Sequence, residues 1–197
     1  MAGEGTLDSA RTAVLSMDLQ AAIVAMYTAG QAELISRAAK VLERCRDRAM
    51  TVVHIQVGFR PGLPEVSPRN ALFGAIRNNP ERQKLFQGEA GQIHPALGPA
   101  ADDIVITKHR ISAFTGTDLD MILRAKQIET LVMFGIATSG VVLSTLLHAV
   151  DADYRVIVVG DCCADLDADV HKALVEKFFP RRGTVMGAAA LLESLAG

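Results

Sequence analysis

The sequence lacks apolar runs long enough to cross a bilayer, since the longest, such as residues 156–159, are only a few residues long. It also lacks an excess of one charge: 20 Lys and Arg against 22 Asp and Glu give a net charge of −2 at pH 7. That balance predicts no attraction to nucleic acid or to an anionic membrane. The N-terminal residues carry no basic region followed by an apolar stretch, so no signal peptide is visible and we expect a cytoplasmic protein.

Cysteine is scarce, with only Cys45, Cys162 and Cys163 in 197 residues. An odd number with two adjacent members does not make a disulfide framework. No Cys-x-x-Cys pair or His-rich spacing indicates a zinc site. We expect Cys45 to be a buried, reduced thiol, because a free cysteine usually packs as a small core residue.

Half of the residues are apolar and 21% are charged, which is ordinary for a globular protein. We expect one domain over residues 1–197, with residues 1–11 as a flexible N-terminal segment. Short β-rich runs alternate with amphipathic segments, and each run is apolar and continuous, as in strands covered on both faces. This pattern predicts an α/β fold of three layers around a mostly parallel sheet. The predicted strands are residues 13–17, 51–57, 104–107, 130–134, 155–159 and a weaker one at 184–186.

Helical periodicity is clearest at residues 31–48, where apolar side chains from Leu34 to Ala49 fall on one stripe. Further helices are predicted at residues 117–126, 139–151, 168–179 and 188–195. Residues 58–103 break the alternation and contain six of the seven prolines, with possible short helices at 71–77 and 81–86. A connection this long is a surface excursion, a lid that supplies substrate contacts, or a subunit contact.

Three polar or glycine-containing segments stand at the ends of predicted strands. Asp18 ends the first, Lys108 ends the third, and Gly135 opens the turn between the fourth strand and the next helix. Ligands bind at the carboxyl ends of strands in such sheets, and helix N-termini present free N–H groups there. Taken alone, Asp18 is equally typical of a helix cap and Lys108 of a solvated charge.

Together the three segments resemble the motifs of the isochorismatase-like cysteine hydrolases. The first reads LSMDLQ (residues 15–20), the second KHRISAF (108–114) and the third GIATSGVV (135–142). The resemblance covers most of the chain and implies strand order 3-2-1-4-5-6, with the site where the order reverses. It also implies a homodimer or a larger homo-oligomer that acts on a small molecule.

The resemblance assigns roles to individual residues. Asp18 is then a general acid or base. Lys108 is then the cation that pairs with Asp18 and with the anion that develops during the reaction. Substrate contacts fall to Gln20, Phe114, Ala137 and Thr138. In the family the peptide that matches Ile136–Ala137 is cis, and the amides of Ala137 and Val141 would form an oxyanion hole.

The nucleophile position of the family holds Val141, which has no group that can attack a substrate. Cys162 or Cys163 could substitute only from within hydrogen-bond reach of a base, and their turn is not the family's nucleophile turn. Asp161 in the same turn is expected to make structural hydrogen bonds, and His171 to begin a helix. The metal cluster of some relatives follows the second strand; residues 56–60 carry no such cluster, so we expect no metal and no cofactor. His54 is mid-strand and is expected to pack or bond locally.

Three functions remain open. In the first, the chain is a hydrolase that needs no thiol, as are true isochorismatases, with Asp18 protonating a vinyl ether before water adds. A nearby Lys108 favours ionised Asp18, so burial would have to oppose it. In the second, the chain is an inactive relative that binds a small molecule or supports a partner. The third, direct attack of water on an amide, ranks lowest because amides are poor electrophiles.

Overall fold

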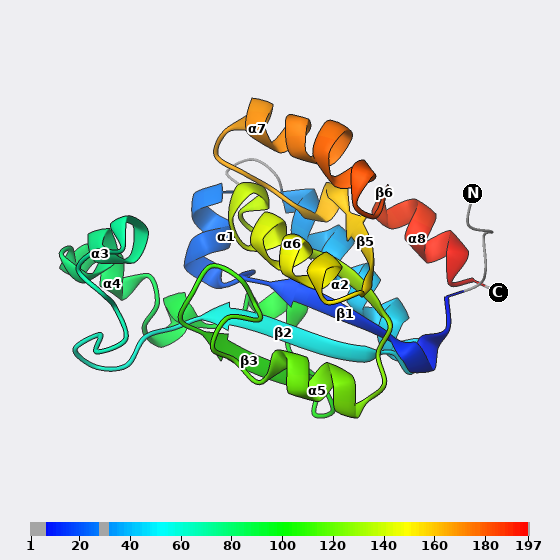
Figure 1. Ribbon diagram of the computed structural model, residues 1–197, viewed down its shortest axis with the longest axis horizontal. Coiled ribbons are helices and arrows are strands. Elements are labelled where there is room, and N and C mark those ends of the chain that lie inside the picture. The colour runs from blue at the N-terminus through cyan, green and yellow to red at the C-terminus, as the bar shows by residue number, and fades with distance from the viewer. Residues whose placement is uncertain (1–6, 28–31, 197) are drawn as a thin grey trace.

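The computed structural model describes residues 7–27 and 32–196 and has a six-stranded parallel sheet at its centre (Figure 1). The sheet order is β3-β2-β1-β4-β5-β6, and every pairing is parallel. The predicted α/β class and strand order are therefore confirmed. The strands are β1 (Thr12–Met17), β2 (Thr51–Val57), β3 (Ile104–Lys108), β4 (Thr130–Gly135), β5 (Arg155–Val159) and β6 (Thr184–Met186).

Helices cover both faces of the sheet. In Figure 1, α6 lies on the viewer's side of the sheet and α2 lies behind it, with α8 packed beside α2. The strand order proceeds outward in one direction from β1 to β3 and in the other direction from β4 to β6. Because the crossovers are right-handed, the helices of the two halves lie on opposite faces of the sheet. The helices are α1 (Ala21–Tyr27), α2 (Ala32–Asp47), α3 (Ala71–Arg77), α4 (Pro80–Lys84), α5 (Leu119–Ala125), α6 (Leu143–Asp151), α7 (Ala168–Ala173) and α8 (Ala188–Ser194).

Some helix predictions need correction. The sequence patterns did not predict α1. The helix predicted at residues 139–151 begins within a π-helical turn, Thr138–Val142, and is α-helical only from Leu143. The helix predicted at 168–179 ends at Ala173 and continues as a second π-helical turn, Leu174–Phe178. The predicted start of α2, Gln31, lies outside the described residues. Within the described ranges, no helix combines the length and the apolar character needed to cross a bilayer.

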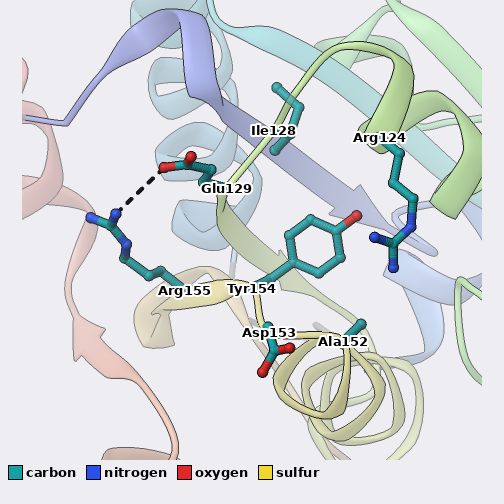
Figure 2. A pocket seen from close by; sticks show the side chains of 7 residues that line it. All are labelled: Arg124, Ile128, Glu129, Ala152, Asp153, Tyr154 and Arg155. Atoms are coloured by element: carbon teal, nitrogen blue, oxygen red, sulfur yellow. Dashed lines mark hydrogen bonds and ion pairs between the residues drawn. The ribbon is translucent and has the colours of Figure 1, made fainter.

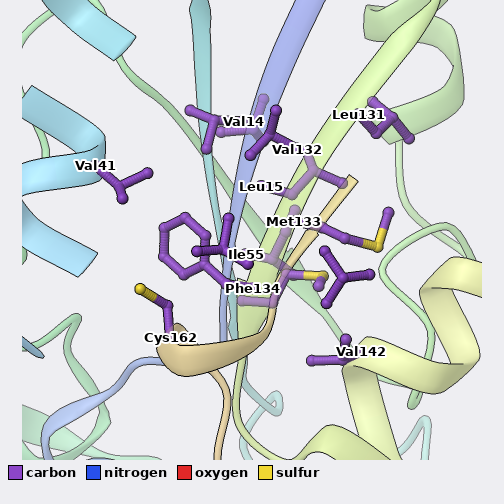
Figure 3. Close-up of a cluster of buried hydrophobic side chains, with 14 of the residues drawn as sticks. Val14, Leu15, Val41, Ile55, Leu131, Val132, Met133, Phe134, Val142 and Cys162 are labelled. Atoms are coloured by element: carbon purple, nitrogen blue, oxygen red, sulfur yellow. The ribbon is translucent and has the colours of Figure 1, made fainter. Parts of the chain in front are cut away.

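The core consists of two apolar layers, one on each side of the sheet. Alternate residues of β4 point to opposite faces, as strand geometry requires. Figure 3 shows Phe134 directed toward Val41 of α2, whereas Met133 lies on the side of Val142. The expectation that every strand is covered on both faces is wrong for β3, where Val105 is 46% exposed, because β3 is an edge strand.

The long segment 58–103 projects beyond the carboxyl ends of the strands, with α3 and α4 at its far end (Figure 1). It has a small apolar cluster of its own, in which Phe59 meets Phe73 and Phe86 edge to face. Residues 92–94 then return to the sheet: the Ala21 N–H donates to the Gln92 carbonyl, and the His94 N–H donates to the Leu19 carbonyl. The segment is thus ordered where it meets the end of β1. Its role as a lid or a subunit contact stays a prediction.

Gly135 permits the end of β4 to lie against the end of β1. A Cβ on Gly135 would stand 2.1 Å from the carbonyl oxygen of Met17, and the backbone φ is +151°. No side chain fits there without a shift of one strand, so glycine at this position sets the distance between the two strand ends.

Replacing Gly135 with alanine should therefore destabilise the fold by about 3 kcal/mol, since overpacked cores lose roughly 1–3 kcal/mol and this clash is with backbone. Urea unfolding would measure it. Gly140→Ala is the matched control, because its Cβ would meet only the Ala137 side chain, at 3.7 Å. Equal stability of the two variants would contradict the close-approach argument.

Candidate active site

A buried ion pair stands at the carboxyl edge of the sheet. Asp18 directly follows β1, with φ +54°, and its N–H donates to the carbonyl of Ile55 at 2.8 Å. Lys108 ends β3, and its Nζ lies 2.8 Å from Asp18 Oδ2. Their side chains are only 9% and 3% exposed. The sheet order β3-β2-β1 brings them together across the end of β2.

The two oxygens of Asp18 are in different situations. Oδ2 is paired with Lys108, whereas Oδ1 is buried and has no hydrogen-bond partner among the described residues. Burial raises the pKa of the Asp18 carboxyl, and the Lys108 ammonium opposes that rise without cancelling it. Lys108 is itself held by a second bond, from Nζ to the Arg110 carbonyl at 3.1 Å. The group that sequence analysis proposed as an acid or base thus has one free oxygen.

The turn after β4 lies beside Asp18, because the Ile136 N–H donates to the Met17 carbonyl at 3.1 Å. The Ile136–Ala137 peptide bond is cis, as the resemblance implied. Val141 is buried in the π-helical turn that follows. The Ala137 N–H has no acceptor among the described residues, so it is available to a bound group. The oxyanion-hole role of Ala137 and Val141 stays a prediction.

Thr138 makes a contact that sequence analysis missed. Its side chain is fully buried, and Oγ1 lies 2.8 Å from Nδ1 of His171 on α7. His171 does lie in the first helical segment after residue 167, as predicted. No sequence signal indicates the contact, because it joins residues 33 positions apart and depends on how α7 packs.

Gln20 is buried, and its side chain is fully engaged with main chain. Nε2 donates to the carbonyls of Val57 and Gly91, and Oε1 accepts from the Val57 N–H at 2.8 Å. Gln20 therefore ties the end of β1 to the end of β2 and to the long segment. Gln20 lies two residues after Asp18 in the sequence, and its side-chain amide is bound to the protein main chain.

Phe114 packs against α6. Its ring stacks on His148 of α6, with ring centroids 4.4 Å apart, and lies near Tyr154, just before β5 begins. The role of Phe114 as a substrate contact stays a prediction. The motif residue that does anchor this segment is Ala113, whose N–H donates to Oγ1 of the buried Thr145.

The cysteines are buried and weakly acidic. Burial raises the pKa of Cys45 and of Cys163 to about 12, and it raises that of Cys162 as well. The Cys163 thiol donates to the Val159 carbonyl, and Cys162 lies among core side chains near Phe134 (Figure 3). The prediction for Cys45 is confirmed. In the described chain neither Cys162 nor Cys163 is hydrogen-bonded to Asp18 or Lys108, so nothing supports either as a substitute nucleophile.

The structure also bears on the expected contacts of Asp161 and His54. Asp161 makes structural bonds, as predicted: its Oδ1 accepts the Ala188 N–H at the start of α8, at 2.7 Å. His54 is buried, in line with the expected packing, and its Nε2 contacts the buried Asp103 carboxylate, 49 residues away, at 3.1 Å. Burial lowers the pKa of His54, and the hydrogen bond to Asp103 opposes this.

Two open hollows on the surface of the described residues lie away from the ion pair. One, of about 350 Å³, is lined by Arg124, Glu129, Tyr154 and Arg155 among others and opens at the amino ends of β4 and β5 (Figure 2). Arg155 and Glu129 are paired with each other there, and Arg124 is paired with Asp120. A second, of about 260 Å³, lies in the long segment around Phe59 and Phe86. Neither is lined by the ion pair, which is enclosed. We assign the candidate site to the ion pair because it carries the chemistry.

Replacing Lys108 with methionine should cost about 3–5 kcal/mol of stability at pH 7, because it leaves Asp18 buried and unpaired. The loss should shrink as the pH falls. The pKa of Asp18 in the folded variant lies further above its unfolded value, so the folded state binds more protons and gains relative stability in acid. Urea unfolding at pH 7 and pH 4.5 would measure this, with exposed Lys40→Met as the control. A deficit that is equal or larger in acid would contradict the assignment.

Comparison with known proteins identifies the family of this fold. The isochorismatase domain model matches residues 12–190. The ureidoacrylate amidohydrolase RutB of Rhizobium rhizogenes is 31% identical, covering 97% of this chain and 87% of its own. The maleamate amidohydrolase of Pseudomonas putida is 29% identical, covering 87% and 80%. The structure of an isochorismatase family protein from Burkholderia thailandensis superposes with a TM-score of 0.83 at 30% identity over 98% of each chain. The chain belongs to the isochorismatase family.

Proposed function

We propose that this protein hydrolyses a small molecule without forming a covalent enzyme intermediate, with Asp18 moving the proton and Lys108 holding Asp18 in place. One observation carries the proposal: Asp18 has one oxygen paired with Lys108 and the other buried without a partner. A buried acceptor left open costs stability unless something binds it, and a catalytic role or a bound group is one explanation for such an atom.

The pKa of Asp18 fits a proton-transfer role. Burial raises it despite the ammonium at 2.8 Å, so the carboxyl can hold a proton more readily than an exposed aspartate. Protonated Asp18 would give its proton to the enol carbon of a substrate such as an enol ether, and the adjacent carbon would then bond to the oxygen of water while a proton of that water returns to Asp18. The hemiketal so formed breaks its bond to the ether oxygen, its hydroxyl proton passes to the departing alcohol, and a carbonyl product remains. The Ala137 N–H would bind the hemiketal oxygen that becomes negative as it loses this proton.

The relatives with named activities are amidohydrolases, which supports a small polar substrate. By resemblance, Val141 occupies the position at which the thiol-using enzymes of the family have their cysteine nucleophile. Valine cannot form a covalent intermediate with a substrate. Water alone attacks amides slowly. A substrate that becomes electrophilic on protonation, such as an enol ether, therefore suits this site better than an amide.

A thermal-shift screen with small carboxylates, amides and enol ethers, followed by turnover assays of the hits, would test the proposal. With a substrate in hand, Asp18→Asn should lower kcat about 100- to 10,000-fold, the usual contribution of general acid–base catalysis. Asp47→Asn, on the exposed end of α2, is the matched control. Unchanged turnover in Asp18→Asn would refute the mechanism. A hit that binds and is never consumed would favour the alternative, a small-molecule binding protein.

Val141→Cys should gain hydrolysis of an amide, such as maleamate, that the wild type leaves intact. The new thiol would lie in the turn beside Asp18, where a base and backbone N–H groups are already in place. Ammonia release and mass spectrometry of an acylated thiol would detect the gain. The matched control is Val142→Cys, since Val142 points into the core (Figure 3). If folded Val141→Cys shows neither signal, the remaining residues do not form hydrolytic machinery.

A further inference from the structure

We infer that three residues after β5, namely Ala164, Asp165 and His171, form a positioning clamp that sets the reactive turn, and that His171 is the member on which it depends. The inference rests on the proposed function, because it assigns these residues to the same reaction. None of them is a catalytic residue in this account, since each acts only through the turn.

The clamp holds the turn by its main chain and by a side chain. The Thr138 N–H donates to the Ala164 carbonyl at 2.9 Å, and the Ser139 N–H donates to Asp165 Oδ2 at 2.7 Å. Residues Ile136 and Ala164 also form a parallel β-bridge. The contact of His171 Nδ1 with Thr138 Oγ1, at 2.8 Å, adds a side-chain bond. Two consecutive amides and one hydroxyl are thus fixed by a single neighbouring segment.

The clamp decides which amide of the turn stays free. The N–H groups of Thr138 and Ser139 are used by the clamp, whereas that of Ala137 has no acceptor among the described residues. A bound oxyanion can therefore receive a hydrogen bond from Ala137 and none from the next two amides. The direction of that donor depends on the position of Thr138.

His171 is the member of the clamp that lies on a helix, α7, and it contacts the side chain of Thr138. Thr138 is fully buried, so its hydroxyl needs a partner, and among the described residues that partner is the imidazole of His171. The start of α7 is itself fixed, because Asp167 Oδ1 accepts the N–H groups of Asp169 and Val170. The helix thus presents His171 from a defined position.

Loss of the clamp should act on the chemical step more than on binding. A displacement of about 1 Å at a group that stabilises the transition state can cost about 100-fold in rate. Among the described residues His171 is hydrogen-bonded to Thr138 and not to Asp18 or Lys108, so we expect the ion pair to stay intact when His171 is replaced. We expect a fall in kcat with little change in KM.

The test compares His171→Leu, which removes the bond, with His171→Asn, whose side-chain amide can occupy the Nδ1 position. The exposed Lys172→Leu on the same helix is the control. Amide hydrogen exchange, followed by NMR without any ligand, reports on the Thr138 and Ser139 N–H groups. Steady-state kinetics would use the panel compound that the wild type consumes fastest.

We expect His171→Leu to speed exchange of both amides at least about 10-fold and to lower kcat about 10- to 100-fold, with KM changing less than about threefold. His171→Asn should restore most of both. Unchanged exchange or unchanged kcat in His171→Leu, or equal effects in Lys172→Leu, would overturn the clamp. If His171→Leu does not fold, Thr138→Val removes the same bond and Thr138→Ser keeps it. If the wild type consumes no compound, the proposed function fails, and hydrogen exchange still decides whether the clamp exists.

Discussion

The buried ion pair of Asp18 and Lys108 is the constraint around which the site is arranged. Removing two charges from water is expensive, and their attraction offsets that cost only when the geometry is close. The 2.8 Å contact requires β1 and β3 to flank β2 in register. It also requires the strand ends to stay in place, which the hydrogen bonds of Gln20 to Val57 and Gly91 support. The architecture of the sheet edge therefore follows from holding one carboxylate beside one ammonium.

The same pair resolves a tension in the chemistry. An ammonium beside a carboxylate favours the ionised form, whereas an acid catalyst must hold a proton. In this fold burial outweighs the ammonium, so the pKa of Asp18 is raised. Lys108 is then better described as a group that orients Oδ2 and leaves Oδ1 open than as one that keeps Asp18 charged. A single environment supplies both the proton affinity and the direction of the free oxygen.

Local patterns predicted the fold well and the site in part. Continuous apolar runs located all six strands, because the central parallel strands are buried on both faces and the edge strand β3 is apolar although Val105 is exposed. The motif residues Asp18 and Lys108 meet as expected. The strand order came from resemblance to a family, since periodicity carries no information about neighbours. Phe114 shows the limit: its motif position is matched, yet its ring stacks on His148, a contact that depends on how α6 packs. The bond between His171 and Thr138 was invisible for the same reason.

The absence of a thiol at Val141 raises the question of whether the site still works, and energetics bear on it. Replacing a buried ion pair with apolar residues of similar volume is often neutral or stabilising by about 1–4 kcal/mol, so a fold that needed only stability would not require this pair. An unpartnered buried oxygen adds a further cost. The chain nevertheless keeps both charges enclosed at the carboxyl edge, beside a turn with a free Ala137 amide. Features that cost stability and converge on one point support a site for chemistry or for binding a polar ligand over a purely structural role.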